Sequence, residues 1–190
     1  MNKKGKLIII SAPSGSGKST ILGEVIKDAS LRLEFSVSAT TRPPRKGETD
    51  GKEYYFLTEQ QFRDAIAADR LAEYQEVYPG RFYGTPKSEI ERIIGHGNNV
   101  VLDLDVLGGI NVKKLYPRDA ISIFIMAPSV EVLRERLMSR GTDSIDDINK
   151  RVEKAAYETS FAPQFDKCVV NDDLATAVTQ AKAIISDFIK

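Results

Sequence analysis

The chain has 190 residues, and its 27 lysines and arginines balance its 27 aspartates and glutamates, so the formal net charge is zero. This balance excludes a global field that would draw the chain to nucleic acid or to a membrane, so any anion recognition has to be local. The length fits a single domain. Because Cys168 is the only cysteine and no long apolar run occurs, we expect a cytoplasmic protein with no membrane partner.

Residues 7–20 carry the first specific pattern, Leu-Ile-Ile-Ile-Ser-Ala-Pro-Ser-Gly-Ser-Gly-Lys-Ser-Thr. A buried strand followed by a Gly/Ser turn and a helix is typical of a phosphate-binding P-loop, where backbone N–H groups and the helix dipole face an anion. A plain turn would explain the glycines but not Lys-Ser-Thr at the helix start. The predicted nucleotide-binding residues are Ala12, Pro13, Ser14, Gly15, Ser16, Gly17, Lys18, Ser19 and Thr20.

Lys18 and Ser19 have the chemistry that this loop requires. We expect Lys18 to reach the β- and γ-phosphates and Ser19 to offer its hydroxyl to Mg²⁺. Ala12 stands where the strict pattern has glycine. We expect Ala12 to keep φ < 0, with Gly15 and Gly17 providing the tight curvature. An amphipathic helix then follows over residues 19–27.

After a short strand at 33–38, the chain becomes polar and contains Arg42-Pro43-Pro44-Arg45. Two guanidinium groups three residues apart on a proline-stiffened turn are pre-organised for a dianion such as a monophosphate. Charges that only meet water would not need the prolines. This segment therefore predicts a second phosphate site, and a strand at 54–57 follows it.

The next segment combines a helix with a hairpin. Thr58 and Gln61 form a capping-box pattern, which predicts a helix start. Residues 71–86 predict two strands around a Pro-Gly turn, and a helix follows at 86–94. Residues 37–87 thus form a predicted β-rich insert.

A buried-strand pattern at 99–103 ends on a carboxylate, Asp103, and Asp105 follows two residues later. A carboxylate at such a strand end lies beside the Mg²⁺ shell in P-loop proteins, so Asp103 is the candidate metal residue, largely through water. Asp105 points the same way and can bond the base or ribose of a second substrate. Capping of a following helix, expected at 109–116, is the alternative role for both aspartates, and it suits Asp105 better than Asp103.

A strand at 120–126 precedes two helices that carry arginines. Ser129 caps the first helix, in which Val130, Leu133 and Leu137 are predicted core residues, and Gly141 ends it. Asp143 opens the second.

Arg136 and Arg140 share a helical face, where like charges cost about 0.2–0.5 kcal/mol, and Arg151 lies on the second helix. We expect residues 134–152 to form a mobile lid whose arginines neutralise the charge that develops in phosphoryl transfer. Arginines on a solvated face are the alternative.

A strand at 167–170 and a helix at 174–189 close the chain. Strands that alternate with helices predict an α/β fold with a parallel sheet covered on both faces. We therefore expect one domain, 1–190, of three-layer P-loop NTPase type, with a core of 1–36 and 98–190 that includes the lid.

These motifs together resemble the guanylate kinase family over most of the chain. The resemblance rests on the P-loop, on Phe35-Ser-Val-Ser-Ala-Thr-Thr-Arg-Pro-Pro-Arg45, on Gly47-Glu48, Gly51-Lys52-Glu53-Tyr54, Tyr83-Gly84-Thr85, Asp103-Leu104-Asp105, Arg140-Gly141-Thr142 and Val170-Asn171-Asp172-Asp173. Members of that family transfer the γ-phosphate of ATP to GMP, with Mg²⁺, giving ADP and GDP.

The resemblance implies a role for each matching residue. Residues 37–87 become a GMP-binding subdomain, and the partners become ATP and GMP or dGMP. Arg42, Arg45, Tyr54 and Tyr83 would hold the GMP phosphate; Ser38, Glu73, Thr85 and Asp105 would read the guanine, with Gly84 and Asp103 also at the GMP site. Arg136, Arg140 and Arg151 would belong to the lid and donor site, Asn171 to the adenine side, and Lys18, Arg42 and the lid arginines to the catalytic set.

Guanine chemistry agrees with Glu73 as a base reader. The N1–H and N2 amino donors of guanine can bond one carboxylate together, whereas adenine lacks this donor pair. A buried Glu73 would be left unpaired against AMP, which can cost several orders of magnitude in discrimination.

Two other functions stay open at this point. Guanylate-kinase-like domains in scaffolding proteins bind phosphorylated partners at the GMP site, although they usually have damaged phosphate loops. A related P-loop kinase for another small phosphorylated acceptor is the other alternative. The sequence leaves open whether the chain is a monomer or a homodimer.

Overall fold

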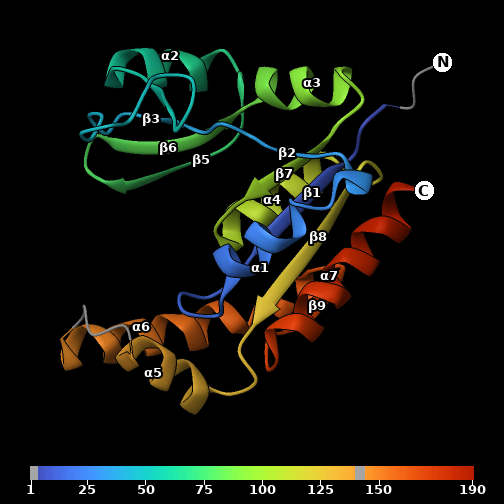
Figure 1. Cartoon of the computed structure of the whole chain (residues 1–190). Helices are drawn as coiled ribbons and strands as arrows, with labels where there is room; N and C mark the ends of the chain where they lie inside the picture. Colours follow the sequence, from blue (N-terminus) through green and yellow to red (C-terminus); the bar gives the residue numbers. More distant parts are fainter. Residues whose placement is uncertain (1–3, 140–143) are drawn as a thin grey trace.

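The computed structural model describes residues 4–139 and 144–190. Its central sheet has five strands in the order β2-β7-β1-β8-β9, and every neighbouring pair is parallel. The predicted parallel α/β fold is confirmed (Figure 1). The strands are β1 (Leu7–Ser11), β2 (Leu33–Phe35), β7 (Asn99–Asp103), β8 (Ala120–Met126) and β9 (Lys167–Val170).

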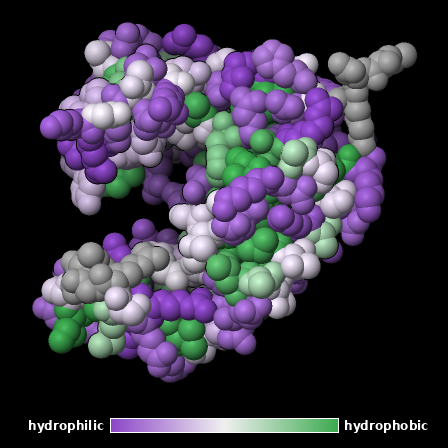
Figure 2. All heavy atoms as spheres, viewed as in Figure 1, coloured by the Kyte–Doolittle hydropathy of each residue, from purple (hydrophilic) through white to green (hydrophobic). Residues whose placement is uncertain are grey.

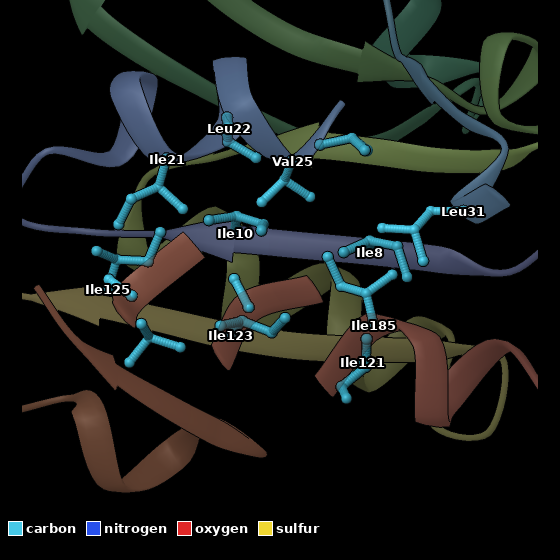
Figure 3. Packing of buried hydrophobic residues seen from close by; sticks show 14 residues of the cluster. Ile8, Ile10, Ile21, Leu22, Val25, Leu31, Ile121, Ile123, Ile125 and Ile185 are labelled. Atoms are coloured by element: carbon cyan, nitrogen blue, oxygen red, sulfur yellow. The ribbon is translucent and has the colours of Figure 1, made fainter. Parts of the chain in front are cut away.

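Helices cover both faces of this sheet because side chains alternate along each strand. Ile8 and Ile10 of β1 pack with α1 and α7, whereas Leu7 and Ile9 pack with α3 and α4 (Figure 3 shows the first side). The result is the predicted three-layer arrangement. The helices are α1 (Lys18–Val25), α3 (Lys87–Gly95), α4 (Val106–Leu115) and α7 (Leu174–Ile189), and a 3₁₀ turn, η1 (Ala29–Leu31), follows α1.

A second, mixed sheet has the order β4-β3-β6-β5 and lies with α2 at one end of the central sheet (Figure 1). Thr58 and Gln61 form both bonds of a capping box at the start of α2, as predicted. Residues 39–86 are called the insert below. Its elements are β3 (Ala39–Thr40), β4 (Tyr55–Phe56), α2 (Glu59–Ala67), β5 (Leu71–Tyr78) and β6 (Arg81–Pro86), and its own core contains Ala39, Phe62, Ala65, Leu71 and Phe82.

Two helices, α5 (Val130–Ser139) and α6 (Ile145–Thr159), form an arm with its own small core, which includes Leu137 and Val152. The arm returns to β9 through the 3₁₀ turn η2 (Ala162–Gln164). Figure 2 shows a deep notch between the insert and the arm, so the molecule has an open C shape in this view. Within the described residues, no helix is long and apolar enough to cross a membrane.

Some sequence-based boundaries were wrong. Helix α4 begins at Val106, not near 109, because the Asp105 side chain accepts a hydrogen bond from the Gly108 N–H and caps the helix there. Helix α6 begins at Ile145, after a Ser144 cap; the expected positions at Gly141 and Asp143 lie outside the described residues.

Val130 was expected in the core, but it is 46% exposed. It borders a cavity of about 260 Å³ opposite small α6 residues such as Ala155 and Ala156, which leave its side chain accessible. Leu133 and Leu137 carry the buried stripe of α5, as predicted.

Candidate functional site

The P-loop and Asp103 lie at the same edge of the central sheet, because the parallel neighbours β1 and β7 both end there. In the register, Ile10 pairs with Asp103. The Lys18 Nζ forms an ion pair with the Asp103 carboxylate and donates a hydrogen bond of 3.3 Å to the carbonyl of Leu104. The structure thus joins two of the predicted site residues directly.

A cavity of about 370 Å³ lies over the P-loop. Every predicted P-loop residue except Ser16 lines it, together with Asp103 and Asp105. Glu158 of α6 also lines it, and burial raises the pKa of its carboxyl. Sequence reasoning missed Glu158; its only signal is a spacing of seven residues from Arg151, which places both on one helical face.

The backbone of the loop behaves as expected. Gly15 and Gly17 have φ of 89° and 88°, and the only non-glycine residues with positive φ in the described part are Arg32 and Asp69. The prediction that Ala12 keeps an ordinary conformation is therefore confirmed. Glycine is required at Gly17 for a second reason, since a methyl group there would overlap the Asn171 side-chain amide.

Asn171 holds the P-loop through a hydrogen bond to its backbone. It is buried, and its Nδ2 donates a hydrogen bond of 2.8 Å to the carbonyl of Ser16. Asn171 also borders a cavity of about 340 Å³ beside Gly17 and Arg136. This placement is compatible with the adenine side and adds a structural role that sequence reasoning missed.

The predicted lid arginines are only partly placed near the loop. Arg136 donates a bond of 3.4 Å to the carbonyl of Asp172, and its Nη1 is buried without a hydrogen-bond partner among the described residues. Arg151 is half-buried on α6. Arg140 lies outside the described residues. Arg136 therefore already borders the P-loop while the arm stands apart from the insert.

On the insert, Arg42 is held in one position by an acidic partner. Its Nη1 and Nη2 donate to the two carboxylate oxygens of Glu48 at 2.9 and 2.8 Å, and the backbone N–H of Arg45 donates to Glu48 at 2.7 Å. Glu48 raises the pKa of Arg42, and Arg42 in turn lowers the pKa of Glu48. Glu48 thus organises the Arg42–Arg45 turn, a role not evident from its position in a polar loop.

The two predicted tyrosines are also brought together at this turn. The Tyr54 and Tyr83 rings meet edge to face with centroids 6.0 Å apart. The Arg42 guanidinium lies 5.4 Å from the Tyr54 ring centroid and 5.7 Å from that of Phe56, within cation–π range. Arg42 is thereby oriented by stacking as well as by its ion pair.

Glu73 faces the core from β5. Thr85 Oγ1 donates a hydrogen bond of 2.7 Å to Glu73 Oε1. A methyl group on Gly108 would lie 3.1 Å from both Glu73 Oε2 and Asp105 Oδ1, so the two carboxylates converge over the start of α4. Burial, with a smaller contribution from the Asp105 charge, raises the pKa of Glu73 to about 7.

The remaining predicted residues surround this convergence. Asp105 caps α4 through a 2.6 Å bond from Gly108 N, and Ser11 Oγ donates to the Asp105 carbonyl at 3.0 Å. Gly84 lies in β6 opposite Tyr74, where an added methyl group would meet the Glu73 carbonyl at 2.8 Å. Ser38 is half-buried at the entry to the insert. The residues predicted for the acceptor site thus come from both the insert and the core.

Comparison with known proteins gives a consistent result. The family model described as guanylate kinase matches residues 4–188. A guanylate kinase of Porphyromonas gingivalis is 52% identical over 184 residues, which cover 97% of this chain and 98% of the relative. One of Bacteroides fragilis is 51% identical over 186 residues, covering 98% and 91%.

A solved structure supports the same grouping. The guanylate kinase from Anaplasma phagocytophilum aligns with a TM-score of 0.74 and 29% identity, covering 98% of this chain and 87% of that one. With the P-loop, the arginine turn and the converging carboxylates in place, the chain belongs to the guanylate kinase family.

Proposed function

We propose that this protein transfers the γ-phosphate of ATP to GMP, giving ADP and GDP. The observation that carries this proposal is the convergence of Glu73 and Asp105, since Asp105 also borders the P-loop cavity and Glu73 belongs to the insert that holds the Arg42–Arg45 turn. Phosphoryl transfer needs two phosphates in line and stabilisation of developing charge, with no covalent protein intermediate.

On the donor side, the backbone N–H groups of the loop would hold the ATP phosphates at the start of α1. Lys18 would leave Asp103 and bind the β- and γ-phosphates, since a polyphosphate carries more charge than one carboxylate. Arg136, with Arg140 and Arg151, would neutralise the transferred group when the arm approaches the insert. Asn171 would contact the adenine side.

On the acceptor side, Arg42, Arg45, Tyr54 and Tyr83 would hold the GMP phosphate. Because Glu48 and the aromatic rings already orient Arg42, little side-chain freedom is lost on binding.

The base would lie against the converging carboxylates. The ionised Glu73 would accept from N1–H and N2 of guanine while Thr85 keeps its carboxylate in position. Ser38, Gly84, Asp103 and Asp105 would complete this side.

The donor set also fits Mg²⁺. The Ser19 hydroxyl and the Asp103 carboxylate border the same cavity as the P-loop, and both are hard oxygen donors of the kind that Mg²⁺ prefers. They would hold the ion largely through water and substrate phosphates. When bound, Mg²⁺ supplies neutralisation of the β- and γ-phosphate charge.

The deciding experiment compares acceptors in a coupled assay that detects ADP formation from ATP. GMP, dGMP, AMP, UMP and ribose bisphosphate are supplied in turn. We expect GMP to give the highest kcat/KM, dGMP to be accepted, and AMP to react at least about 10²-fold less efficiently. Absence of ADP formation with GMP would favour a phosphopeptide-binding module, and a better acceptor elsewhere in the panel would favour a different kinase.

We further propose a cytoplasmic location; the oligomeric state has to be measured. Cell fractionation tests the location, and light scattering after gel filtration distinguishes a monomer from a homodimer.

A further inference from the structure

The chain crosses between the central sheet and the insert twice, and the buried carboxylate of Glu89 lies close to both crossings. The chain enters the insert through residues 36–38 and leaves it at Pro86, where α3 begins. Glu89, in the first turn of α3, is only 3% exposed. A carboxylate is rarely buried this deeply unless its charge is fully paired.

The Glu89 carboxylate accepts hydrogen bonds from three residues. The Val37 backbone N–H donates to its Oε1 at 3.4 Å, and the Tyr55 hydroxyl donates to its Oε2 at 3.1 Å. Arg92 donates to both oxygens, from Nη2 at 2.8 Å and from Nε at 3.1 Å. These bonds lower the pKa of Glu89, with Arg92 making the largest contribution.

The network continues into the central sheet. Arg92 Nη2 also donates to Glu34 of β2 at 2.7 Å, and Asn98 donates to the other Glu34 oxygen at 2.9 Å. Tyr55 belongs to the insert and Glu34 to the core, so the chain of contacts Tyr55–Glu89–Arg92–Glu34 bridges the two parts. Packed apolar residues can stabilise a junction as well as buried charges do, and in some proteins the role of buried hydrogen-bonded charges is to select one geometry.

The contacts of Glu89 also surround one proposed base reader. On the core side, the Ser36 N–H donates to the Val101 carbonyl of β7 at 3.0 Å, so Val37 is the first residue after the pairing with the central sheet ends. The next residue is Ser38, whose carbonyl accepts a 2.9 Å hydrogen bond from the Tyr55 N–H. Glu89 therefore holds both the residue before Ser38 and the tyrosine that binds Ser38.

We propose that Glu89 is a positioning residue that fixes the angle of the insert on the core and thereby places the GMP site relative to the P-loop. This inference rests on the proposed function, because it takes the insert to be the GMP-binding part. Loss of the clamp would let the insert adopt many angles, only some of which align the two phosphates.

The kinetic test replaces Glu89→Gln, which keeps the shape but removes the charge that pairs with Arg92. We expect kcat to fall because the two phosphates are misaligned, and KM for GMP to rise about tenfold because Glu73 of the insert no longer meets Asp105 of the core. KM for ATP should change less than about twofold, since no residue of the insert, which the structure describes throughout, lines the P-loop cavity. The matched control is Glu91→Gln on the exposed side of the same helix, which should leave all of these constants unchanged.

A second measurement reports the angle itself. Cys168 is exposed on β9 and provides one labelling site on the part that contains the central sheet. Gln60→Cys, on the exposed face of α2, provides the other on the insert. We expect a narrow distribution of label-to-label distances without substrate in the parent protein and a broader one with Glu89→Gln, which GMP narrows again. A lower melting temperature with unchanged KM for GMP and unchanged distances would overturn the proposal.

A milder variant keeps the test decisive if Glu89→Gln does not fold. Tyr55→Phe removes one hydrogen bond to Glu89 and should change KM for GMP and the distance distribution in the same direction, by a smaller factor. If neither changes, the proposal is wrong. Arg45→Lys distinguishes failure of the Glu89 proposal from failure of the proposed GMP site. If Arg45→Lys also leaves KM for GMP unchanged, the GMP site itself has been misplaced.

Discussion

The proposed donor and acceptor sites are built in different ways. The P-loop is one continuous run whose backbone would do most of the binding, shaped by Gly15 and Gly17 at positive φ. The acceptor side is assembled from side chains of the β3–β4 connection, β5, β6 and the start of α4. A backbone cradle suits any nucleotide phosphate, whereas converging side chains can distinguish one base from another.

The two sides also differ in how their charges are paired. Arg42 is bound by Glu48 at two points and Glu73 by Thr85, so the acceptor side is oriented before any ligand arrives. Lys18 is paired with Asp103, a partner that a polyphosphate can replace. Under the proposed function, the donor side would therefore be the more general of the two, and the acceptor side would determine the substrate.

The largest expected effect comes from Lys18, the P-loop residue that acts through its side-chain charge. Lys18→Met should fold but lose about 10³-fold or more in kcat, because the charge that stabilises the transferred phosphate is gone. Steady-state kinetics with circular dichroism checks both statements. Lys27→Met removes an exposed lysine just after the same helix and should retain full activity. Substantial turnover by Lys18→Met would contradict the donor assignment.

The acceptor side is tested by Glu73→Gln. We expect the ratio of kcat/KM for GMP over AMP to fall about 10²-fold, because the amide has only one acceptor oxygen and its NH₂ group opposes the guanine donors. Competition between the two acceptors measures this ratio. Glu76→Gln, on the same strand, is the control, since a glutamine can still accept the bond that Glu76 receives from Gly80 N. An unchanged preference with Glu73→Gln would remove Glu73 as the base reader.

The raised pKa of Glu73, about 7 against an ordinary 4.5, would make the proposed GMP binding depend on pH. Only the ionised carboxylate accepts both guanine donors, so KM for GMP should rise about tenfold from pH 8 to pH 6.

Folding stability should change in the opposite sense. In the unfolded chain Glu73 has its ordinary pKa of 4.5, which is lower than in the folded protein. The contribution of protonated Glu73 to the free energy of unfolding is therefore fully present below about pH 4.5 and is lost as the pH rises through about 7. Glu73→Gln should flatten both dependences, as measured by kinetics and by chemical denaturation against pH. A pH-dependent KM that survives in this variant would point to another group.

The smallest expected effects distinguish two glycines at the donor side. Gly17→Ala should destabilise the fold by about 1–2 kcal/mol, because alanine is strained at φ of 88° and its methyl group would displace Asn171. Gly23→Ala, inside α1 with open space around it, should stabilise by about 0.5–1 kcal/mol. Denaturation midpoints compare the two. A destabilisation of equal size in both would mean that the loop conformation does not require glycine.

Most of the fold could be predicted because its signals are local. The alternation of strands and helices, the Thr58 capping box and the ends of β8 and β9 depend on residues within one or two turns of each other. The start of α4 was misplaced because Gly108 and Gly109 resemble a turn in sequence. Only the Asp105 cap reveals that they are helical.

The sequence by itself was enough to predict a nucleotide-phosphate site at residues 12–20, because every group that makes this loop is contiguous and the backbone geometry follows from glycine. Only the tertiary structure decided which carboxylates meet. Glu73 and Asp105 are far apart in the chain and converge because β5 lies against α4. It likewise revealed the pairing of Arg42 with Glu48, the support of the loop by Asn171 and the burial of Glu89 at the junction. The ionisation and pairing of these side chains depend on burial and on contacts between residues far apart in the sequence. Neither can be known before the chain has folded.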